Sequence, residues 1–164
     1  MKRALGGMPF VVTQAGGPGR IAFSRDAAGE VVTLPLHPSM ELDVREHAFL
    51  AASHSVRYSF ERINGLANIL HGGSGMYLDR FVTAGEPGIV LLHGYGNVFE
   101  RTLGPGEKIL VEPGGYLYKD SSVTMQAVPV NVRTGMLRQG IYLAEMTGPG
   151  RLGIQSMYHH HASG

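Results

Sequence analysis

The sequence contains no cysteine. Disulfides, thiolate metal sites, iron–sulfur clusters and cysteine nucleophiles are therefore excluded. Charged residues are also scarce, at 16% of the 164 residues, and the formal net charge is only +1. This balance excludes a strongly basic chain that binds nucleic acid by charge alone, and it excludes an acidic tail protein.

Long hydrophobic runs are missing as well. No apolar stretch approaches the roughly 18–20 residues of a membrane-spanning helix, so we expect no transmembrane segment. Residues 1–10 carry Lys2 and Arg3 but continue with Gly6, Gly7 and Pro9, which make a poor core for a signal peptide. We therefore expect a cytoplasmic protein.

Glycine is abundant, with 24 residues spread between short apolar runs. Such spacing separates strands by turns and leaves little room for helices of ordinary length. Residues 89–92 are continuously apolar and predict a strand buried on both faces. Two further runs alternate apolar and polar residues, as half-buried strands do; their apolar positions are Met40, Leu42 and Val44, and Val56, Tyr58 and Phe60. The pattern predicts an all-β sandwich or barrel, with a short helical turn or apolar loop over 63–70.

The chain also resembles itself. Residues 29–56 align with residues 96–123 without a gap, at an offset of 67 positions. The identical pairs are Gly29 with Gly96, Val31 with Val98, Leu36 with Leu103, Pro38 with Pro105, Val44 with Val111, Leu50 with Leu117, Ser55 with Ser122 and Val56 with Val123. A β-pattern produces some chance matches at Gly and Pro, but here strands and turns repeat as a block. We interpret the block as a duplicated β-meander, since one meander cannot bury its apolar face alone.

These features predict one β-domain over residues 8–158 and a tail over 159–164. The two copies span about 10–60 and 77–130. The Gly-Pro-Gly-Arg turn at 17–20 returns at 148–151. It predicts a partial third copy over 141–156, which closes a sheet or pairs with a neighbour.

Histidine is the first candidate for chemistry, with eight residues. A cupin-type metal site needs a His-x-His pair, a Glu and a further His on a partner strand, but no His-x-His occurs outside the run 159–161. Tyr118 and Ala51 stand where the last ligand of each copy is expected, and neither replaces imidazole. We therefore assign no metal ligand, no cofactor and no catalytic residue. The remaining histidines are interpreted as ordinary side chains, and 159–161 as a tail or an expression remnant; they are His37, His47, His54, His71 and His93.

Other catalytic patterns are incomplete. Around Ser74 the lipase pattern Gly-x-Ser-x-Gly fails, because Met76 stands at the last glycine. The Gly-x-Gly at 94–96 lacks the third glycine of a dinucleotide-binding loop. Glu41 and Asp43 share the predicted solvent face of one strand. The other acids are isolated in sequence, although a pair could form in the fold; they are Asp79, Glu100, Glu107, Glu112 and Asp120.

Aromatic residues beside basic ones are the pattern of a nucleic-acid stacking surface. Tyr116 and Tyr118 precede Lys119, and alternation places both rings on one face. We interpret them as part of an aromatic cluster in the core. A net charge of +1 gives little attraction for phosphate, so no DNA partner is expected.

Taken in order, the turn and strand motifs resemble a known family. They are GPGR at 17–20, GEVV at 29–32, AFLAA at 48–52, GGSGMYL at 72–78, LGPGE at 103–107, VEPGGYL at 111–117, TGPGR at 147–151 and IQS at 154–156. Over residues 10–156 the chain is similar to the altered-inheritance-of-mitochondria 24 family. The resemblance implies an all-β fold similar to the tryptophan RNA-binding attenuation protein, of double-stranded β-helix type. It also implies a homo-oligomer, with a trimer suggested, and it offers no catalytic residues to carry over.

We therefore expect a non-enzymatic scaffold or interaction protein that self-assembles through its β-surfaces, with a protein partner that the sequence does not identify. An exposed apolar segment over 63–70 would add an interface patch. Two alternatives stay open. One is a cupin-like protein that binds a small ligand or a metal through unconventional ligands, and the other is an RNA-binding protein, suggested by fold analogy alone.

Overall fold

The computed structural model describes residues 4–5, 8–9, 12–63, 76–130 and 141–157. Strands dominate it, so the all-β prediction is confirmed. They are β1 (Ala4–Leu5), β2 (Met8–Pro9), β3 (Gly29–Leu36), β4 (Leu42–Arg45), β5 (Phe49–Ala52), β6 (Val56–Ile63), β7 (Met76–Thr83), β8 (Gly88–Tyr95), β9 (Val98–Leu103), β10 (Lys108–Val111), β11 (Tyr116–Asp120), β12 (Thr124–Val130), β13 (Ile141–Thr147) and β14 (Gly150–Gln155). A short 3₁₀ turn, η1 (Pro113–Gly115), precedes β11.

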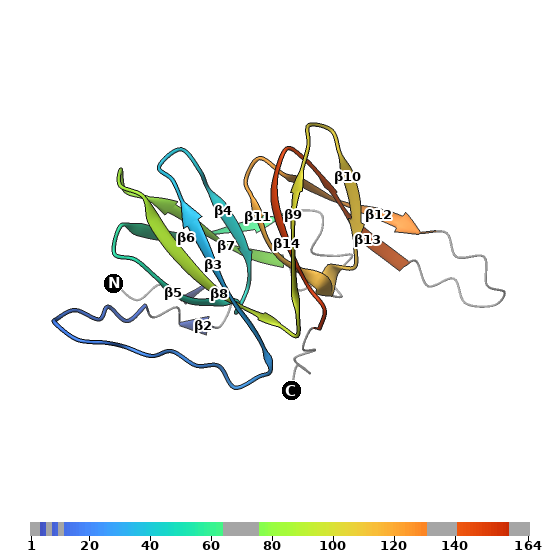
Figure 1. Cartoon of the computed structure of the whole chain (residues 1–164). Helices are drawn as coiled ribbons and strands as arrows, with labels where there is room; N and C mark the ends of the chain where they lie inside the picture. The colour runs from blue at the N-terminus through green and yellow to red at the C-terminus, as the bar shows by residue number, and fades with distance from the viewer. Residues whose placement is uncertain (1–3, 6–7, 10–11, 64–75, 131–140, 158–164) are drawn as a thin grey trace.

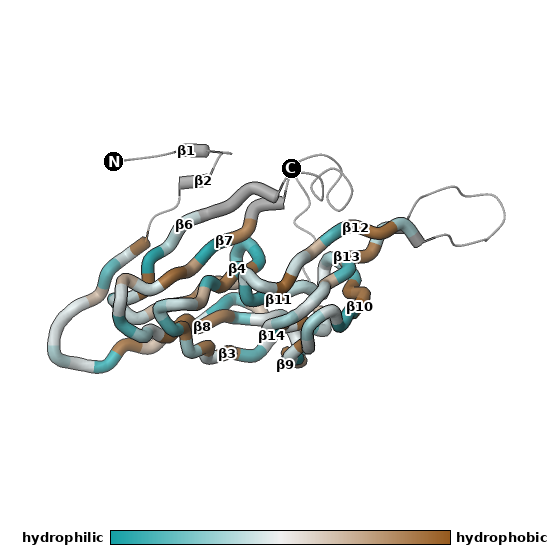
Figure 2. The backbone as a smooth tube through the Cα atoms, turned by 90° about the horizontal axis from the view of Figure 1, so that it is seen from above, coloured by the Kyte–Doolittle hydropathy of each residue, from teal (hydrophilic) through white to brown (hydrophobic). Residues whose placement is uncertain are grey.

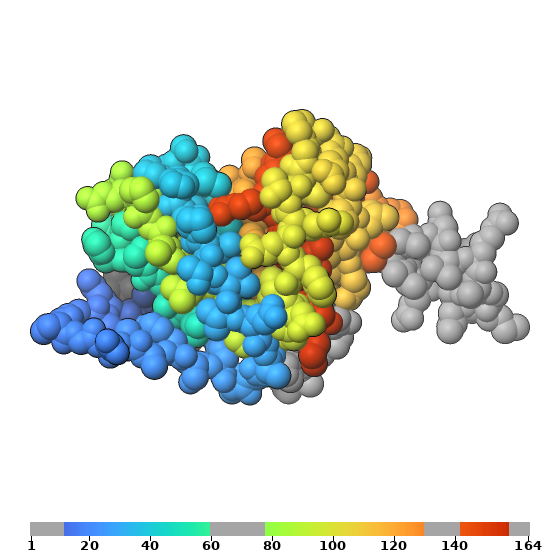
Figure 3. Space-filling view, viewed as in Figure 1, coloured from blue at the N-terminus to red at the C-terminus, as the bar shows by residue number. Residues whose placement is uncertain are grey.

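Over the described ranges, the strands form four antiparallel sheets. One is the short pair β1–β2, and two have three strands in the orders β3–β8–β5 and β10–β13–β12. The fourth has six strands in the order β6–β7–β4–β11–β14–β9. Figure 1 shows β3 to β8 on one side of the molecule and β9 to β14 on the other, and Figure 3 shows the same groups as two adjoining lobes. We refer to these groups as the first half and the second half.

Strand β3 shows why these residues form amphipathic strands. Val32, Leu34 and Leu36 are buried, while the residues between them are exposed, as the two-residue period of a strand requires. Pro35 is tolerated because β3 lies at the edge of its sheet, where a missing N–H need not serve a second neighbour. Figure 2 shows β3 beside β8 from above, in agreement with their pairing along all eight residues of β3.

The predicted strand over 89–92 exists within β8, but its predicted burial on both faces is wrong. Val90 and Leu92 are fully buried, whereas Ile89 is exposed. The reason is that β8 belongs to a three-stranded sheet with one face on the core, so its second face stays at the surface. A continuous apolar run therefore marks a half-buried strand here.

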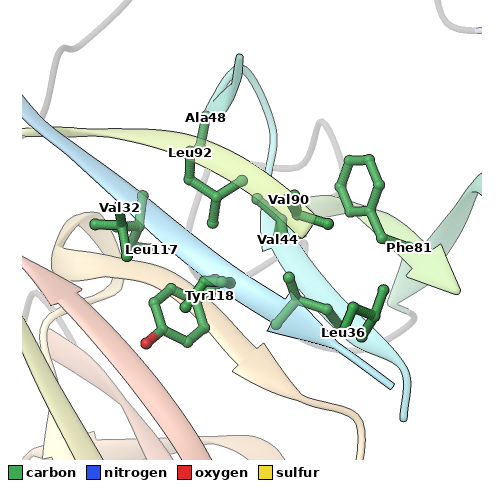
Figure 4. Close-up of a cluster of buried hydrophobic side chains, with 11 residues drawn as sticks. Val32, Leu36, Val44, Ala48, Phe81, Val90, Leu92, Leu117 and Tyr118 are labelled. Carbon is green, nitrogen blue, oxygen red and sulfur yellow. The ribbon is translucent and has the colours of Figure 1, made fainter. Parts of the chain in front are cut away.

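The core consists of two clusters, one in each half. The first gathers residues of β3, β4 and β8 and includes Leu117 and Tyr118 from β11 (Figure 4). The second lies among the strands of the second half and includes Tyr116 and, from β7, Leu78. The prediction that Tyr116 and Tyr118 share a face is wrong, because β11 carries a β-bulge between them. Each half thus buries side chains that the other half supplies.

The remaining predicted segments lie partly in the second half and partly outside the described residues. The segment predicted as a third copy, 141–156, forms β13 and β14, which lie in the second half. The predicted turn or loop over 63–70 lies outside the described residues, apart from Ile63 at the end of β6. In the parts of the chain that the structure describes, no helix is long and apolar enough to cross a membrane. The double-stranded β-helix type stays a prediction.

Candidate functional site

The two halves join where β4 pairs with β11 in the middle of the six-stranded sheet. Val44 lies opposite Tyr118, and Asp43 lies opposite Lys119. The other edge of β4 pairs with β7, and the other edge of β11 pairs with β14. We call the β4–β11 pairing the joint. It brings Asp43 and Lys119 into contact although they are 76 positions apart in sequence.

A buried carboxylate lies at the joint. Asp43 is only 2% exposed, and its Oδ2 accepts a hydrogen bond from Lys119 Nζ at 2.7 Å. Arg80 of β7 donates from Nε to Asp43 Oδ1 at 2.7 Å and from Nη2 to Oδ2 at 3.1 Å. Arg80 Nη1 also lies 3.7 Å from Glu41 Oε2. Two cations therefore hold both oxygens of Asp43, which fixes the geometry of three neighbouring strands.

The charge state of Asp43 follows from these contacts. Burial alone would raise its pKa, because a carboxylate loses its hydration in the protein interior. The hydrogen bonds from Arg80 and Lys119, together with their positive charges, outweigh burial and hold the pKa of Asp43 below its ordinary value. Asp43 is thus an ionised counter-ion whose oxygens are already engaged, which suits it to joining strands.

Backbone carbonyls near η1 are bound by side chains from β4 and β11. Arg45, the last residue of β4, donates from Nη1 to the carbonyls of Pro113 and Gly114 at 3.0 and 2.9 Å. In return, Tyr116 of β11 donates its hydroxyl to the Asp43 carbonyl at 2.8 Å. The bonds from Arg45 satisfy carbonyls of η1, where regular strand pairing stops, and the bond from Tyr116 adds a further link between β11 and β4.

A second ion pair extends the joint to β14. Asp120, at the end of β11, accepts hydrogen bonds from Arg151 Nη2 at 2.9 Å and from the Arg151 backbone N–H at 2.7 Å. Arg151 Nη1 also donates to the carbonyl of Pro35 at 3.1 Å, which ties β14 to β3 of the first half. The hydrogen bond to Asp120 raises the pKa of Arg151 above its ordinary value.

Two tyrosine–carboxylate pairs lie beside the joint. Tyr58 donates its hydroxyl to Asp79 Oδ1 at 2.7 Å, and Tyr118 donates to Glu100 Oε2. Burial is the largest cause that raises the pKa of both phenols and of the Asp79 carboxyl. Asp79 therefore differs from Asp43, since its bonding partner carries no charge.

The structure separates most of the residues that the sequence raised as candidates. Among the described residues, no group of three His, Asp or Glu side chains is placed to hold a metal ion. His93 is buried, and its ring packs edge-on against the ring of Tyr95, with the two ring centroids 5.4 Å apart. Ser74 and the histidines at 71 and 159–161 lie outside the described ranges. The other histidines are exposed; they are His37, His47 and His54.

Sequence reasoning missed the joint. It placed Asp43 on a solvent face with Glu41, and that prediction is wrong because β11 covers Asp43. The alternation was read correctly, but it does not show which strand lies beside β4. One signal was available in the self-alignment, where Asp43 and Lys119 correspond to Leu110 and Ala52. Two opposite charges thus stand where the other copy has two apolar residues, but the alignment does not place β4 beside β11.

Comparison with known proteins places this architecture in context. The profile of the family described as mitochondrial biogenesis AIM24 matches residues 1–157. Among solved structures, the chain is similar to protein SPYM3_0169 from Streptococcus pyogenes, with 20% sequence identity and a TM-score of 0.60. The match covers 81% of this chain and 56% of that one, so the chain spans little more than half the length of that relative. At this identity the likeness shows a shared fold alone. No curated protein sequence matches the chain significantly.

Proposed function

We propose that this chain, which belongs to the mitochondrial biogenesis AIM24 family, is a non-enzymatic scaffold or interaction protein that assembles with copies of itself through its β-sheets. The proposed assembly is a homo-oligomer, with three chains as the size to test first. The proposed location is the cytoplasm.

The observation that carries this proposal is the position of large apolar side chains on edge strands. Val31 on β3, Phe99 on β9 and Leu110 on β10 are each more than half exposed, and each strand lies at the edge of its sheet in the described part of the chain. Exposed strand edges with apolar side chains favour association with another chain, and soluble monomers usually protect them with charge or proline.

The buried polar groups support a structural role. Asp43, Asp120 and Arg151 make ion pairs between strands, and these bonds connect the two halves. Such a fixed framework presents its edges in one geometry, which is what a scaffold requires.

The direct test is the molar mass of the chain in solution by light scattering at micromolar concentration. The proposal predicts a multiple of 17.6 kDa that persists on dilution. A monomer across the whole concentration range would contradict it.

Two further measurements test the alternative functions. Stoichiometric metal retained by protein lacking residues 159–164 would favour a cupin-like metal protein over the scaffold. RNA binding that weakens steeply as salt is raised would favour a nucleic-acid function.

A further inference from the structure

The two halves repeat one pattern of strand pairing. In the first half β4, β7 and β6 are consecutive neighbours in one sheet, and β3, β8 and β5 in another. The second half repeats both orders. The order β10–β13–β12 matches β4–β7–β6, and the order β9–β14–β11 matches β3–β8–β5. Six strands of one half therefore correspond, one by one and in chain order, to six strands of the other. In this correspondence β10 is the counterpart of β4, and β5 is the counterpart of β11.

Local geometry supports the correspondence of β5 with β11. The β-bulge of β5 lies between Phe49 and Ala51, and the β-bulge of β11 lies between Tyr116 and Tyr118. These positions differ by the same 67 residues that align the two copies. The turn before each strand also matches. Before β5, Ala48 N–H donates to the Arg45 carbonyl at 3.1 Å, and before β11, Gly115 N–H donates to the Glu112 carbonyl at 2.8 Å. The backbone of β5 is thus shaped like that of the strand at the joint.

The joint uses only one edge strand from each half. It pairs β4 with β11, while their counterparts β10 and β5 have, within the described ranges, a strand neighbour on one side alone. We propose that β10 of one chain pairs with β5 of a second copy, in a repetition of the joint between chains. This proposal rests on the self-assembly proposed above and specifies its surface. Figure 1 shows β5 and β10 in opposite halves, so one chain can contact two neighbours at once.

The correspondence also gives the register of the contact. Because Tyr118 lies opposite Val44 and Lys119 lies opposite Asp43 at the joint, the intermolecular pairs are Ala51 with Val111 and Ala52 with Leu110. Further along, Ser53 meets Ile109. The strands run antiparallel, as β4 and β11 do.

Burial at corresponding positions agrees with a missing neighbour. Asp43 is 2% exposed because the joint covers it, whereas its counterpart Leu110 is 53% exposed. Similarly, Leu117 of β11 is fully buried in the core of the other half, and its counterpart Leu50 is only half-buried. Pairing between chains would cover both leucines. Leu110 would face Ala52, so an apolar pair replaces the ion pair of the joint.

The end of β5 carries a charge that fits this arrangement. At the joint, Arg45 binds the carbonyl of Gly114. The counterpart of Arg45 is Glu112, and the counterpart of Gly114 is His47. The carbonyl of His47 already accepts a hydrogen bond from Arg25 of the same chain. An incoming β10 therefore brings Glu112 to the Arg25 guanidinium, and the two form an ion pair across the interface.

Such a contact is heterologous, because it joins two different edges. Heterologous contacts extend head to tail and close into a ring when the rotation between neighbours allows it. An isologous dimer would instead pair β5 with β5 or β10 with β10. This difference makes the proposal testable by mixing variants.

The experiment places a lysine on each edge separately. Leu110→Lys blocks β10, and Ala51→Lys blocks β5 because its side chain would enter the core of the neighbouring chain beside Val111. Each variant alone is expected to be monomeric by native mass spectrometry at a concentration where the unmodified chain assembles. An equal mixture is expected to form a one-to-one heterodimer and nothing larger, since one intact β5 and one intact β10 remain.

The matched control is Ile89→Lys, which makes the same kind of change at a residue 45% exposed on β8, a strand that has a neighbour on each side in its sheet. It should assemble like the unmodified chain, and circular dichroism should show that every variant keeps its strands. If the unmodified chain is oligomeric but both blocking variants stay assembled, the edge pairing is wrong while self-assembly stands. If either variant alone forms a stable dimer, the contact is isologous and the proposal fails. A monomeric unmodified chain would overturn both proposals.

Discussion

At the scale of single residues, Asp43 is the centre of the joint. It is an ionised carboxylate held by Lys119 and Arg80, with little access to solvent. Removing one partner of a buried ion pair leaves the others without compensation, which costs far more than an exposed pair is worth. Asp43 therefore links the fold of one half to the position of the other.

Asp43→Asn should destabilise the chain strongly. The amide keeps the size of the side chain but leaves the buried Lys119 ammonium without its carboxylate and removes the bidentate partner of Arg80, so we expect a loss of about 3 kcal/mol in the free energy of unfolding. For a chain of this length that corresponds to a decrease in Tm of roughly 6–12 °C, measured by thermal denaturation at neutral pH.

The control is Asp79→Asn, a second buried carboxylate on the neighbouring strand. Asp79 is bonded by the neutral hydroxyl of Tyr58, and an amide oxygen can accept the same bond. Its free energy of unfolding should change by no more than about 1 kcal/mol. Equal losses of unfolding free energy in both variants would mean that the ion pairs of Asp43 with Arg80 and Lys119 are not the cause of the effect.

The pH dependence of stability should distinguish the same two acids. Because the pKa of Asp43 is lowered in the folded chain, its contribution is present above the pKa of the unfolded chain and is lost as pH falls through the folded value. The Tm difference between the unmodified chain and Asp43→Asn should therefore shrink below about pH 4. The raised pKa of Asp79 gives the opposite sign, since its contribution is lost as pH rises. Thermal denaturation from neutral to acidic pH measures both, and parallel curves would contradict this assignment.

Single residues were also where prediction from sequence reached its limit. Alternation predicts which residues share a face of a strand, and it located the buried Leu42 and Val44. It cannot show that a strand 76 positions away covers Asp43. Nor can it place Tyr116 and Tyr118 on different cores, because a β-bulge shifts the period without a sequence signal of its own.

At the scale of elements, strands were predicted well and their environments less well. The alternating runs became β4 and β6, and the continuous run became part of β8. Burial of β8 on one face only depends on how sheets stack, which a local window does not contain. The pairing of β4 with β11 likewise depends on tertiary structure.

The end of β5 supplies a test at this scale. Arg25→Glu should weaken assembly, because it places like charges at the contact with Glu112. We expect the dissociation constant to rise roughly fivefold, as for an exposed ion pair of about 1 kcal/mol. Glu112→Arg should have a similar effect, measured by sedimentation across a dilution series.

The decisive comparison combines the two reversals. An equal mixture of Arg25→Glu and Glu112→Arg chains restores opposite charges wherever the two kinds of chain alternate. It should assemble more tightly than either variant alone, although a ring of three keeps one like-charge contact. If the mixture is as weak as either variant, the two residues do not meet. High salt should reduce all of these differences, since both side chains are exposed.

At the scale of the whole molecule, two similar halves share a six-stranded sheet and exchange core residues. The sequence indicated the all-β class, because alternation and turns leave local patterns in the chain, and the structure confirms that class. Duplication of the meander stays a prediction. The sequence did not indicate how the halves meet, or that the joint leaves two counterpart edges available. Those features follow from pairing between distant strands, and they define the two edges of the proposed assembly.

Disulfide cross-linking of Ala52 to Leu110 between chains tests the central claim most directly. The chain has no cysteine of its own, so an Ala52→Cys chain and a Leu110→Cys chain each carry a single thiol. Residues directly opposite in an antiparallel pair lie close enough for a disulfide. Edge-to-edge assembly predicts a covalent dimer when the two variants are mixed under oxidising conditions, and little or none from either variant alone. Cross-linking of either variant with itself, or a mixture no more reactive than one in which Ile89→Cys replaces Ala52→Cys, would contradict edge-to-edge assembly.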